Sequence, residues 1–194
     1  NWVKKNYDLK HGMDVLDVGC GNGAQIFDFI NVVGPDGSIS GIDISEESIE
    51  EIKQKSAKYK NIDVIADDMN NLENTIKNDF KVKKYDISHA TYALAYASDP
   101  TKILDAMRLS LKKEGRLIIT SPIDPNSLRE LAKKLGNPLP KYDSIGRFPK
   151  EILEPYFRSY FYKVKIEIVK NILEIKEKNL PHTLINKTIL RSIA

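Results

Sequence analysis

Three glycines and two acids in the first quarter of the sequence have types and spacing suited to holding a nucleotide. Asp17 lies near the end of an apolar run, and Gly19, Gly21 and Gly23 follow it at alternate positions. Because glycine has no Cβ, a bound molecule can lie directly on the backbone of such a turn. Asp43 ends the next strand-like run, 20 residues after Gly23, where a carboxylate can accept hydrogen bonds from both hydroxyls of a ribose. This layout is typical of a nucleotide-binding βαβ unit.

The charge of Asp17 indicates which nucleotide the turn suits. Gly19, Gly21 and Ala24 also satisfy the dinucleotide pattern G-x-G-x-x-A. A dinucleotide places its pyrophosphate on this turn and on the following helix N-terminus, where Asp17 would repel it. S-adenosylmethionine has no phosphate, and a carboxylate attracts its ammonium by about 1 kcal/mol in water and several times more in a closed cleft. The residues therefore favour S-adenosylmethionine over a nicotinamide dinucleotide.

Five segments, in the same order along the chain, resemble the class I S-adenosylmethionine-dependent methyltransferases. They lie within residues 3–122 and are Val15–Gly23, Gly41–Ser45, Ala66–Met69, Tyr85–Leu94 and Leu111–Ile119. The resemblance implies an α/β, Rossmann-like fold, with a seven-stranded, mostly parallel sheet and helices on both faces. We expect an antiparallel hairpin at the C-terminal edge of that sheet.

The resemblance also implies which residues hold the donor. Asp43 would bind the ribose, Ile44 would pack on the adenine, and Asp67 would accept from the exocyclic amine of the adenine. The backbone N–H of Asp68 would meet a ring nitrogen, and Met69 would close the adenine slot. The full expected donor site is Asp17, Gly19, Cys20, Gly21, Gly23, Asp43, Ile44, Asp67, Asp68, Met69 and Ala90. The alternatives are a helix-capping role for Asp43, solvated loop acids at positions 67 and 68, and a turn-stabilising acid at position 17.

The end of the fourth expected strand should face the methyl acceptor. Many relatives that methylate exocyclic amines carry an Asn/Asp-Pro-Pro-aromatic motif here, but this chain has Ala90-Thr91-Tyr92-Ala93, which argues against that acceptor. His89, Thr91, Tyr92 and Tyr96 are the acceptor-site candidates. His89 has a pKa suited to a general base, and the alternative is a histidine packed inside the strand. The alternative for Tyr92 and Tyr96 is packing in the core.

Strand-like and helix-like segments alternate, which predicts a parallel sheet covered on both faces. Strands are expected at 14–18, 38–42, 62–66, 85–90 and 116–120, with helices at 23–33, 46–59 and from residue 100 to a stop at Glu114-Gly115. Residues 70–84 suggest a short helix and a loop. A further helix is expected at 126–135, and a hairpin is expected from 163–169 and 172–175.

Length indicates one domain over residues 1–194, with a substrate-side insertion at about 122–162. Aromatic residues in that insertion are candidates for lining the acceptor pocket: Tyr142, Phe148, Tyr156, Phe157 and Tyr160. The sequence begins at Asn1 rather than Met, and we expect the N-terminal extension of the family to be missing.

Composition limits the function classes. The chain is 41% hydrophobic and 29% charged, and it has no apolar run near the ~20 residues of a membrane span, so we expect a cytoplasmic protein without a membrane partner. Cys20 is the single cysteine and is expected to be a small structural residue. Three scattered histidines and one cysteine do not predict a metal site.

The favoured function is methyl transfer to a small molecule. Two alternatives stay open from the sequence. The first is an RNA methyltransferase, which a net charge of +3 is compatible with. The second is a non-catalytic subunit that binds S-adenosylmethionine or activates a partner, which the lack of an identified acceptor base keeps open.

Overall fold

The structure is a computed structural model that describes residues 7–122 and 148–168. The chain divides into two compact units, residues 1–121 and 122–194, and each is described by itself. The boundary coincides with the expected start of the substrate-side insertion at residue 122. The single domain expected from the length stays a prediction.

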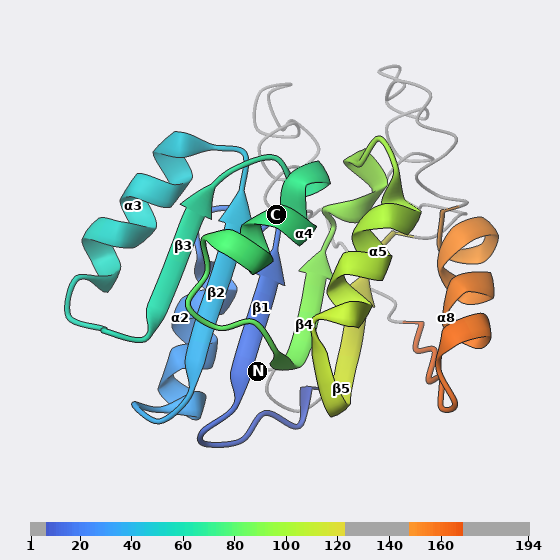
Figure 1. The fold of residues 1–194 in the computed structure, drawn as a ribbon, viewed down its shortest axis with the longest axis horizontal. Helices are drawn as coiled ribbons and strands as arrows, with labels where there is room; N and C mark the ends of the chain where they lie inside the picture. Colours follow the sequence, from blue (N-terminus) through green and yellow to red (C-terminus); the bar gives the residue numbers. More distant parts are fainter. Residues whose placement is uncertain (1–6, 123–147, 169–194) are drawn as a thin grey trace, which may run out of the picture. The chain divides into compact units, whose positions relative to one another are not determined.

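The first unit is built on a parallel sheet in the order β3-β2-β1-β4-β5 (Figure 1). Neighbouring strands pair in parallel throughout. The strands are β1 (Asp14–Val18), β2 (Ser38–Asp43), β3 (Ile62–Ala66), β4 (Tyr85–Thr91) and β5 (Leu111–Thr120). The chain order reverses between β1 and β4, and ligands of open α/β sheets bind at such a switch point, beyond the carboxyl ends of the strands.

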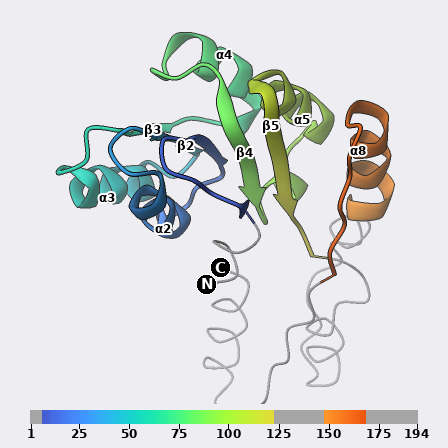
Figure 2. The same ribbon diagram turned by 90° about the horizontal axis from the view of Figure 1, so that it is seen from below.

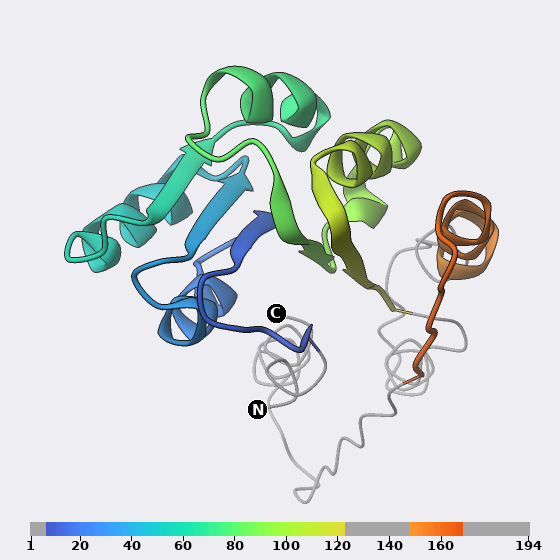
Figure 3. The ribbon, with the colours of Figure 1, turned by 60° about the horizontal axis from the view of Figure 1, so that its bottom comes forward.

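Helices cover both faces of this sheet. Figures 2 and 3 show α2 and α3 against one face and α4 and α5 against the other. The helices are α2 (Ala24–Val33), α3 (Glu46–Ser56), α4 (Leu72–Asn78) and α5 (Pro100–Leu109), with short 3₁₀ turns η1 (Met69–Asn71) and η2 (Leu94–Tyr96). Ile26, Phe29 and Ile52 are buried in the core on the α2 and α3 face. The expected alternation of strands and helices is confirmed.

Local capping explains where the helices begin. The Ser45 hydroxyl accepts the N–H of Ser48 at 3.2 Å, and Glu46 and Glu47 occupy the first turn of α3, where the helix dipole favours negative charge. Asp99 accepts the N–H groups of residues 101 and 102 at the start of α5. Both starts follow the sequence pattern.

The end of α5 differs from the prediction. The helix stops at Leu109, and β5 already begins at Leu111, so Glu114-Gly115 does not end a helix. Leu111 pairs with Tyr85, and the register then shifts before Arg116 pairs with Ile87. A Cβ on Gly115 would lie 2.8 Å from the carbonyl oxygen of Tyr85. The glycine therefore permits a bulge inside β5.

The expected seven strands are also corrected. The described residues form five strands, all parallel, and residues 163–168 are not in a strand. Two of the three apolar side chains expected to face inward there, Ile166 and Ile168, are 55% and 66% exposed. Alternation alone did not make a strand, because it supplies no buried partner surface. Residues 169–175, the rest of the expected hairpin, lie outside the described residues, as does the expected helix at 126–135.

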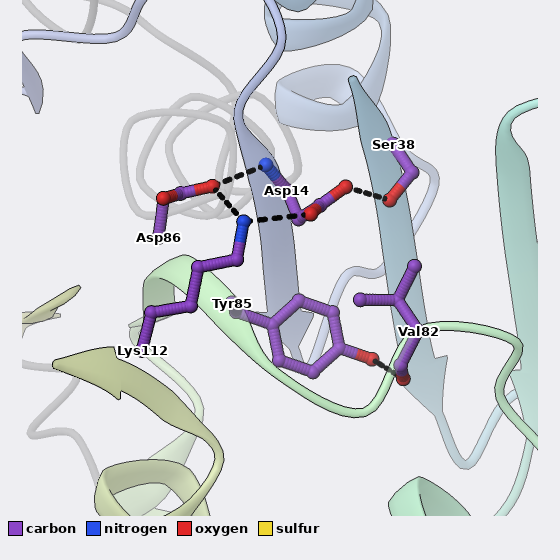
Figure 4. Close-up of polar contacts among 6 residues, drawn as sticks. All are labelled: Asp14, Ser38, Val82, Tyr85, Asp86 and Lys112. Atoms are coloured by element: carbon purple, nitrogen blue, oxygen red, sulfur yellow. Dashed lines mark hydrogen bonds and ion pairs between the residues drawn. The ribbon is translucent and has the colours of Figure 1, made fainter. Parts of the chain in front are cut away.

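A polar cluster joins four strands at the edge of the sheet opposite the carboxyl ends (Figure 4). The Lys112 ammonium lies 2.9 Å from Asp14 Oδ2 and 2.8 Å from Asp86 Oδ2, and Asp86 also accepts the Asp14 N–H at 2.8 Å. The Ser38 hydroxyl donates to Asp14 Oδ1 at 2.6 Å. Because β1, β2, β4 and β5 each supply one member, the cluster holds their starting ends in register.

The described part of the second unit contains a π-helical turn, η3 (Pro149–Leu153), and α8 (Glu154–Tyr160). Tyr156 is buried and packs on Tyr160, with ring centroids 4.8 Å apart. None of the helices in the described ranges combines the length and apolar character needed to cross a membrane.

Candidate donor site at the carboxyl ends of the strands

The glycine turn after β1 is attached to the end of β2. The N–H groups of Gly19 and Cys20 both donate to the carbonyl oxygen of Ile42, at 2.8 and 3.1 Å. Gly19, Gly21 and Gly23 have φ values of 76°, 50° and 78°, which L-residues with a side chain rarely adopt. All three positions therefore require glycine for the backbone alone.

The surroundings of the three glycines differ. A Cβ on Gly19 would lie 2.4 Å from Ala93 Cβ, and one on Gly23 would lie 2.7 Å from Ile52 Cγ1. At Gly21, no atom of the described residues comes within 4 Å of the Cβ position. Gly19 thus permits close packing of the loop after β4, Gly23 permits close packing of α3, and Gly21 faces open space. Of the three glycines, Gly21 alone has open space among the described residues at its Cβ position, where a ligand could lie against the backbone.

Asp43 stands beside that open space. Its Oδ2 accepts the Gly21 N–H at 2.8 Å and its Oδ1 accepts the Ser45 N–H at 3.0 Å. The carboxylate therefore joins the glycine turn to the first residues of α3, and each oxygen retains a lone pair for another donor. The next residue, Ile44, is 72% exposed. An exposed isoleucine directly after a buried strand offers an apolar surface to a flat ligand.

Asp17 and His89 face each other beneath the turn. They are register partners on β1 and β4, and His89 Nε2 lies 3.5 Å from Asp17 Oδ1. Both side chains are buried, and the His89 ring packs edge-on against Tyr7 and Phe29, with centroids 5.4 and 5.0 Å away. Burial raises the pKa of Asp17 to about 8, with a further contribution from the charge of Asp43. Burial lowers the pKa of His89 to about 3.

Cys20, inside the turn, is buried, and this burial raises the pKa of its thiol. It is therefore protonated and unreactive at neutral pH.

The loop after β3 is held by its own acids. Asp67 accepts from the side chains of Asn71 and Thr75 at 2.9 and 2.8 Å, and from the N–H of Asp68 at 2.8 Å. The hydrogen bond from Asn71 contributes most to lowering the pKa of Asp67, against the opposing effect of burial. The N–H of Asp67 donates to the carbonyl oxygen of Asp43 at 3.0 Å. This loop is therefore fixed next to the end of β2.

Met69 brings the same loop close to the glycine turn. Its Cε lies 4.0 Å from the position of a Cβ on Gly19. Met69 also borders a narrow surface hollow between α4 and α5, lined by Leu72 and Ile103 among others.

The loop after β4 crosses the turn and meets the loop after β3. Ala90 is buried, and Tyr92 has a φ of 56° with its N–H bonded to the Thr120 carbonyl oxygen at 2.9 Å. The Ser98 hydroxyl donates to Asn70 Oδ1 at 2.8 Å, and Asn70 Nδ2 donates to Asp68 Oδ1 at 2.7 Å. The sequence analysis missed Asn70 and Ser98, because their pairing depends on two loops that are distant in sequence.

The acceptor candidates separate in the structure. His89 is fully buried and faces α2, whereas Tyr96 is 69% exposed. A general base needs contact with the group that it deprotonates, so the position of His89 favours the packed-histidine interpretation.

In the second unit, Phe148 and Tyr156 are buried and Tyr160 is 54% exposed, and Tyr142 lies outside the described residues.

Comparisons with known proteins place this chain in a family. The family model described as a methyltransferase domain matches residues 9–179. The chain belongs to the methyltransferase-domain family. Nocamycin O-methyltransferase of Saccharothrix syringae is 30% identical over 125 residues, 64% of this chain and 43% of that protein. Demethylmenaquinone methyltransferase of Staphylococcus aureus is 26% identical over 165 residues, 85% of this chain and 61% of that protein.

A solved structure agrees with this assignment. An S-adenosylmethionine-dependent methyltransferase from Aquifex aeolicus matches with a TM-score of 0.54 and 26% identity, over 70% of this chain and 76% of that one. The matches to the two sequence relatives span less than two thirds of either protein. The predicted family, its Rossmann-like class and its donor, S-adenosylmethionine, are thereby confirmed.

The residues at the switch point fit the donor of this methyltransferase family. Gly21 presents bare backbone to open space, Asp43 has spare acceptor capacity beside it, and Ile44 is exposed. All charged residues in the two segments 43–47 and 67–71 are acidic: Asp43, Glu46, Glu47, Asp67 and Asp68. These charges suit a cationic ligand and oppose a phosphorylated one.

Proposed function

We propose that this chain catalyses methyl transfer from S-adenosylmethionine to a small-molecule acceptor. The observation that carries the proposal is the open cradle at Gly21 with the Asp43 carboxylate bonded to its N–H. S-adenosylmethionine supplies an electrophilic methyl group on sulfur, and transfer to a nucleophile forms one bond to that carbon, breaks its C–S bond and leaves S-adenosylhomocysteine. The enzyme's main contribution is to align donor and acceptor.

The roles of the donor-site residues follow from their positions. Asp43 would accept from the ribose hydroxyls, since charge-assisted hydrogen bonds are roughly twice as strong as neutral ones. Ile44 would lie on one face of the adenine, with Met69 closing the slot. Asp67 would accept from the exocyclic amine. Its present bond to the N–H of Asp68 would be exchanged for a bond from that N–H to the adenine ring.

Thr91, Tyr92 and Tyr96 are the proposed contacts to the acceptor. They belong to β4 and the loop that follows it, beside the glycine turn. Tyr96 is largely exposed, so its ring is available to an acceptor, whereas His89 supplies no base on that side. A base is needed only where the acceptor must lose a proton during the transfer.

The acidic character of this edge supports a small molecule over RNA. RNA-binding surfaces need Lys or Arg near the phosphates, whereas the segments after β2 and β3 carry only acids, as given above. The names of the two relatives, nocamycin O-methyltransferase and demethylmenaquinone methyltransferase, point the same way. Catalysis, rather than a non-catalytic binding role, is proposed because the family model that matches residues 9–179 is a methyltransferase domain.

The test is methyl incorporation. The protein is incubated with methyl-labelled S-adenosylmethionine and either a small-metabolite extract or total RNA, with the Asp43→Ala variant as control. We expect label in a low-molecular-mass product with the wild type and at least tenfold less with the variant. Label in RNA would replace the small-molecule proposal. Donor binding without any labelled product from either fraction would favour the non-catalytic subunit.

A further inference from the structure

Buried polar atoms gather under the glycine turn without hydrogen-bond partners. Asp17 Oδ2 and both His89 ring nitrogens are among the buried polar atoms of the described residues that have no hydrogen-bond partner. Asp17, His89 and Tyr7 are each at least 99% buried. Buried polar atoms are nearly always paired, so this group requires an explanation.

The geometry does not support an isolated Asp17 carboxylate. One of its oxygens has no donor among the described residues, and the other lies 3.5 Å from His89 Nε2. An unpaired buried charge is neutralised by holding a proton rather than remaining ionised. A proton on either member of the pair makes the pair neutral overall.

We propose that the Asp17–His89 pair holds one proton in the free protein and that binding of the cationic donor releases it to solvent. This inference rests on the proposed donor site. The O–H bond of the Asp17 carboxyl breaks, its electron pair stays on the carboxylate, and the proton passes to buffer. The resulting negative charge attracts the ammonium of the ligand across a dry interior, where Coulomb attraction is several times larger than in water.

Of Asp17 and the titratable groups around it, Asp17 is the one that can release a proton near neutral pH. Tyr7 precedes β1, Cys20 lies in the turn, Asp43 ends β2, and His89 comes from β4. Burial raises the pKa of Tyr7 to about 12, and burial also raises the pKa of Cys20, so both keep their protons at neutral pH. The raised pKa of Asp17 and the lowered pKa of His89 agree with a neutral pair.

His89 acts in this scheme as a positioning residue. Its ring packs against Tyr7 and Phe29, and its Nε2 lies 3.5 Å from Asp17 Oδ1. It therefore sets how readily Asp17 ionises.

Calorimetric titration with S-adenosylhomocysteine at pH 7, in two buffers of different ionisation enthalpy, measures the protons released. We expect about one proton from the wild type and none from Asp17→Asn, since a single group with a pKa above the working pH loses its proton on binding. Asp36→Asn, which removes an exposed acid at the opposite edge, should match the wild type. The same variants report on any proton that comes from the ligand's own amine.

A pH series tests His89. Wild-type affinity should rise with pH by up to tenfold per unit below the pKa of Asp17 and then level off. His89→Phe keeps the aromatic packing and removes the polar partner, so its affinity should level off at a higher pH. An unchanged levelling point would overturn the role of His89.

Ligand binding without proton release by the wild type would overturn the inference and leave the proposed function standing. Equal release by Asp17→Asn would also overturn it. If the ligand did not bind at all, both the inference and the donor site would fall. Because the wild-type proton count is decisive by itself, the test does not depend on either variant folding.

Discussion

The carboxylate of Asp43 accepts the backbone N–H of Gly21 at 2.8 Å. This bond connects the carboxyl end of β2 to the turn after β1, which are the two places where a nucleotide-binding unit contacts its ligand. The bond orients the carboxylate next to the one position of the turn that faces open space among the described residues.

Gly21→Ala should abolish donor binding and leave the fold largely intact. Gly12→Ala is the matched control, because Gly12 also has a positive φ, 79°, and its Cβ position is likewise clear of described atoms within 4 Å. Each substitution should destabilise the protein by about 1–2 kcal/mol through backbone strain. Only the Cβ at position 21 would occupy space needed by the ligand, as titration with S-adenosylhomocysteine would show. Equal affinities for the two variants would exclude Gly21 from the site.

Asp43→Ala should weaken binding of S-adenosylhomocysteine at least tenfold. The variant loses two ribose hydrogen bonds, each worth about 1 kcal/mol or more to a charged group. It also loses the bonds to the N–H groups of Gly21 and Ser45, so the free energy of unfolding should fall by about 1–2 kcal/mol. Asp36→Ala, at an exposed turn, should change neither quantity. Unchanged affinity in calorimetry would remove Asp43 from the site.

The Asp17–His89 pair should make the free energy of unfolding fall as the pH rises from 6.5 to 8. The folded pKa of Asp17, about 8, exceeds its ordinary value of 3.8, so stability falls as pH rises between these values. The folded pKa of His89, about 3, lies below its ordinary value of 6.5, so stability rises with pH between those. The two slopes cancel between pH 3.8 and 6.5, and stability should then fall by about 2 kcal/mol toward pH 8.

Urea unfolding at pH 6.5 and 8 measures this fall, and Asp17→Asn should remove it. A wild type with equal stability at both values would show that Asp17 is already ionised in the folded protein.

Lys112→Met should lower the free energy of unfolding at neutral pH by about 1 kcal/mol, a value limited by the partial exposure of the lysine. It leaves Asp14 and Asp86 without their shared cation (Figure 4). Burial alone would raise the pKa of Asp86, but its bonds to Lys112 and to the Asp14 N–H lower it. Burial alone would lower the pKa of Lys112, but its hydrogen bonds to Asp86 and Asp14 and their charges raise it.

The contribution of this cluster is therefore present at neutral pH. It is lost as pH falls through the lowered pKa of Asp86 or rises through the raised pKa of Lys112. Lys113→Met, at the exposed neighbouring position, is the control. Equal losses in denaturant unfolding for both variants would show that the cluster adds nothing to stability.

The parallel sheet could be predicted from the sequence because its signals are local, and so could the positions of the acids and glycines at the ends of its strands. Apolar runs define β1 to β4, and the acids and glycines lie directly at their ends. The different roles of Gly19, Gly21 and Gly23 could not be predicted, because Ala93 and Ile52 reach the turn from distant parts of the chain.

Pairing between distant strands explains the other differences. Asp17 lies opposite His89 because β1 pairs with β4 as well as with β2. The spacing of residues along the chain does not reveal which residues of β1 and β4 lie opposite each other. The early start of β5 likewise depends on the pairing of Leu111 with Tyr85. The local spacing of apolar residues instead predicted that the helix continues past this point. The alternation at 163–168 suggested a strand, but pairing requires a partner edge that a single segment does not specify.

The central claim is that the turn beside Asp43 holds S-adenosylmethionine and not a dinucleotide. Thermal unfolding in the presence of saturating S-adenosylhomocysteine or NAD tests it most directly. A ligand at 100 times its Kd stabilises a protein by about 2.7 kcal/mol, which raises the Tm of a chain of this size by about 5 °C or more. We expect this rise with S-adenosylhomocysteine and no change with NAD. A rise with NAD and none with S-adenosylhomocysteine would contradict it.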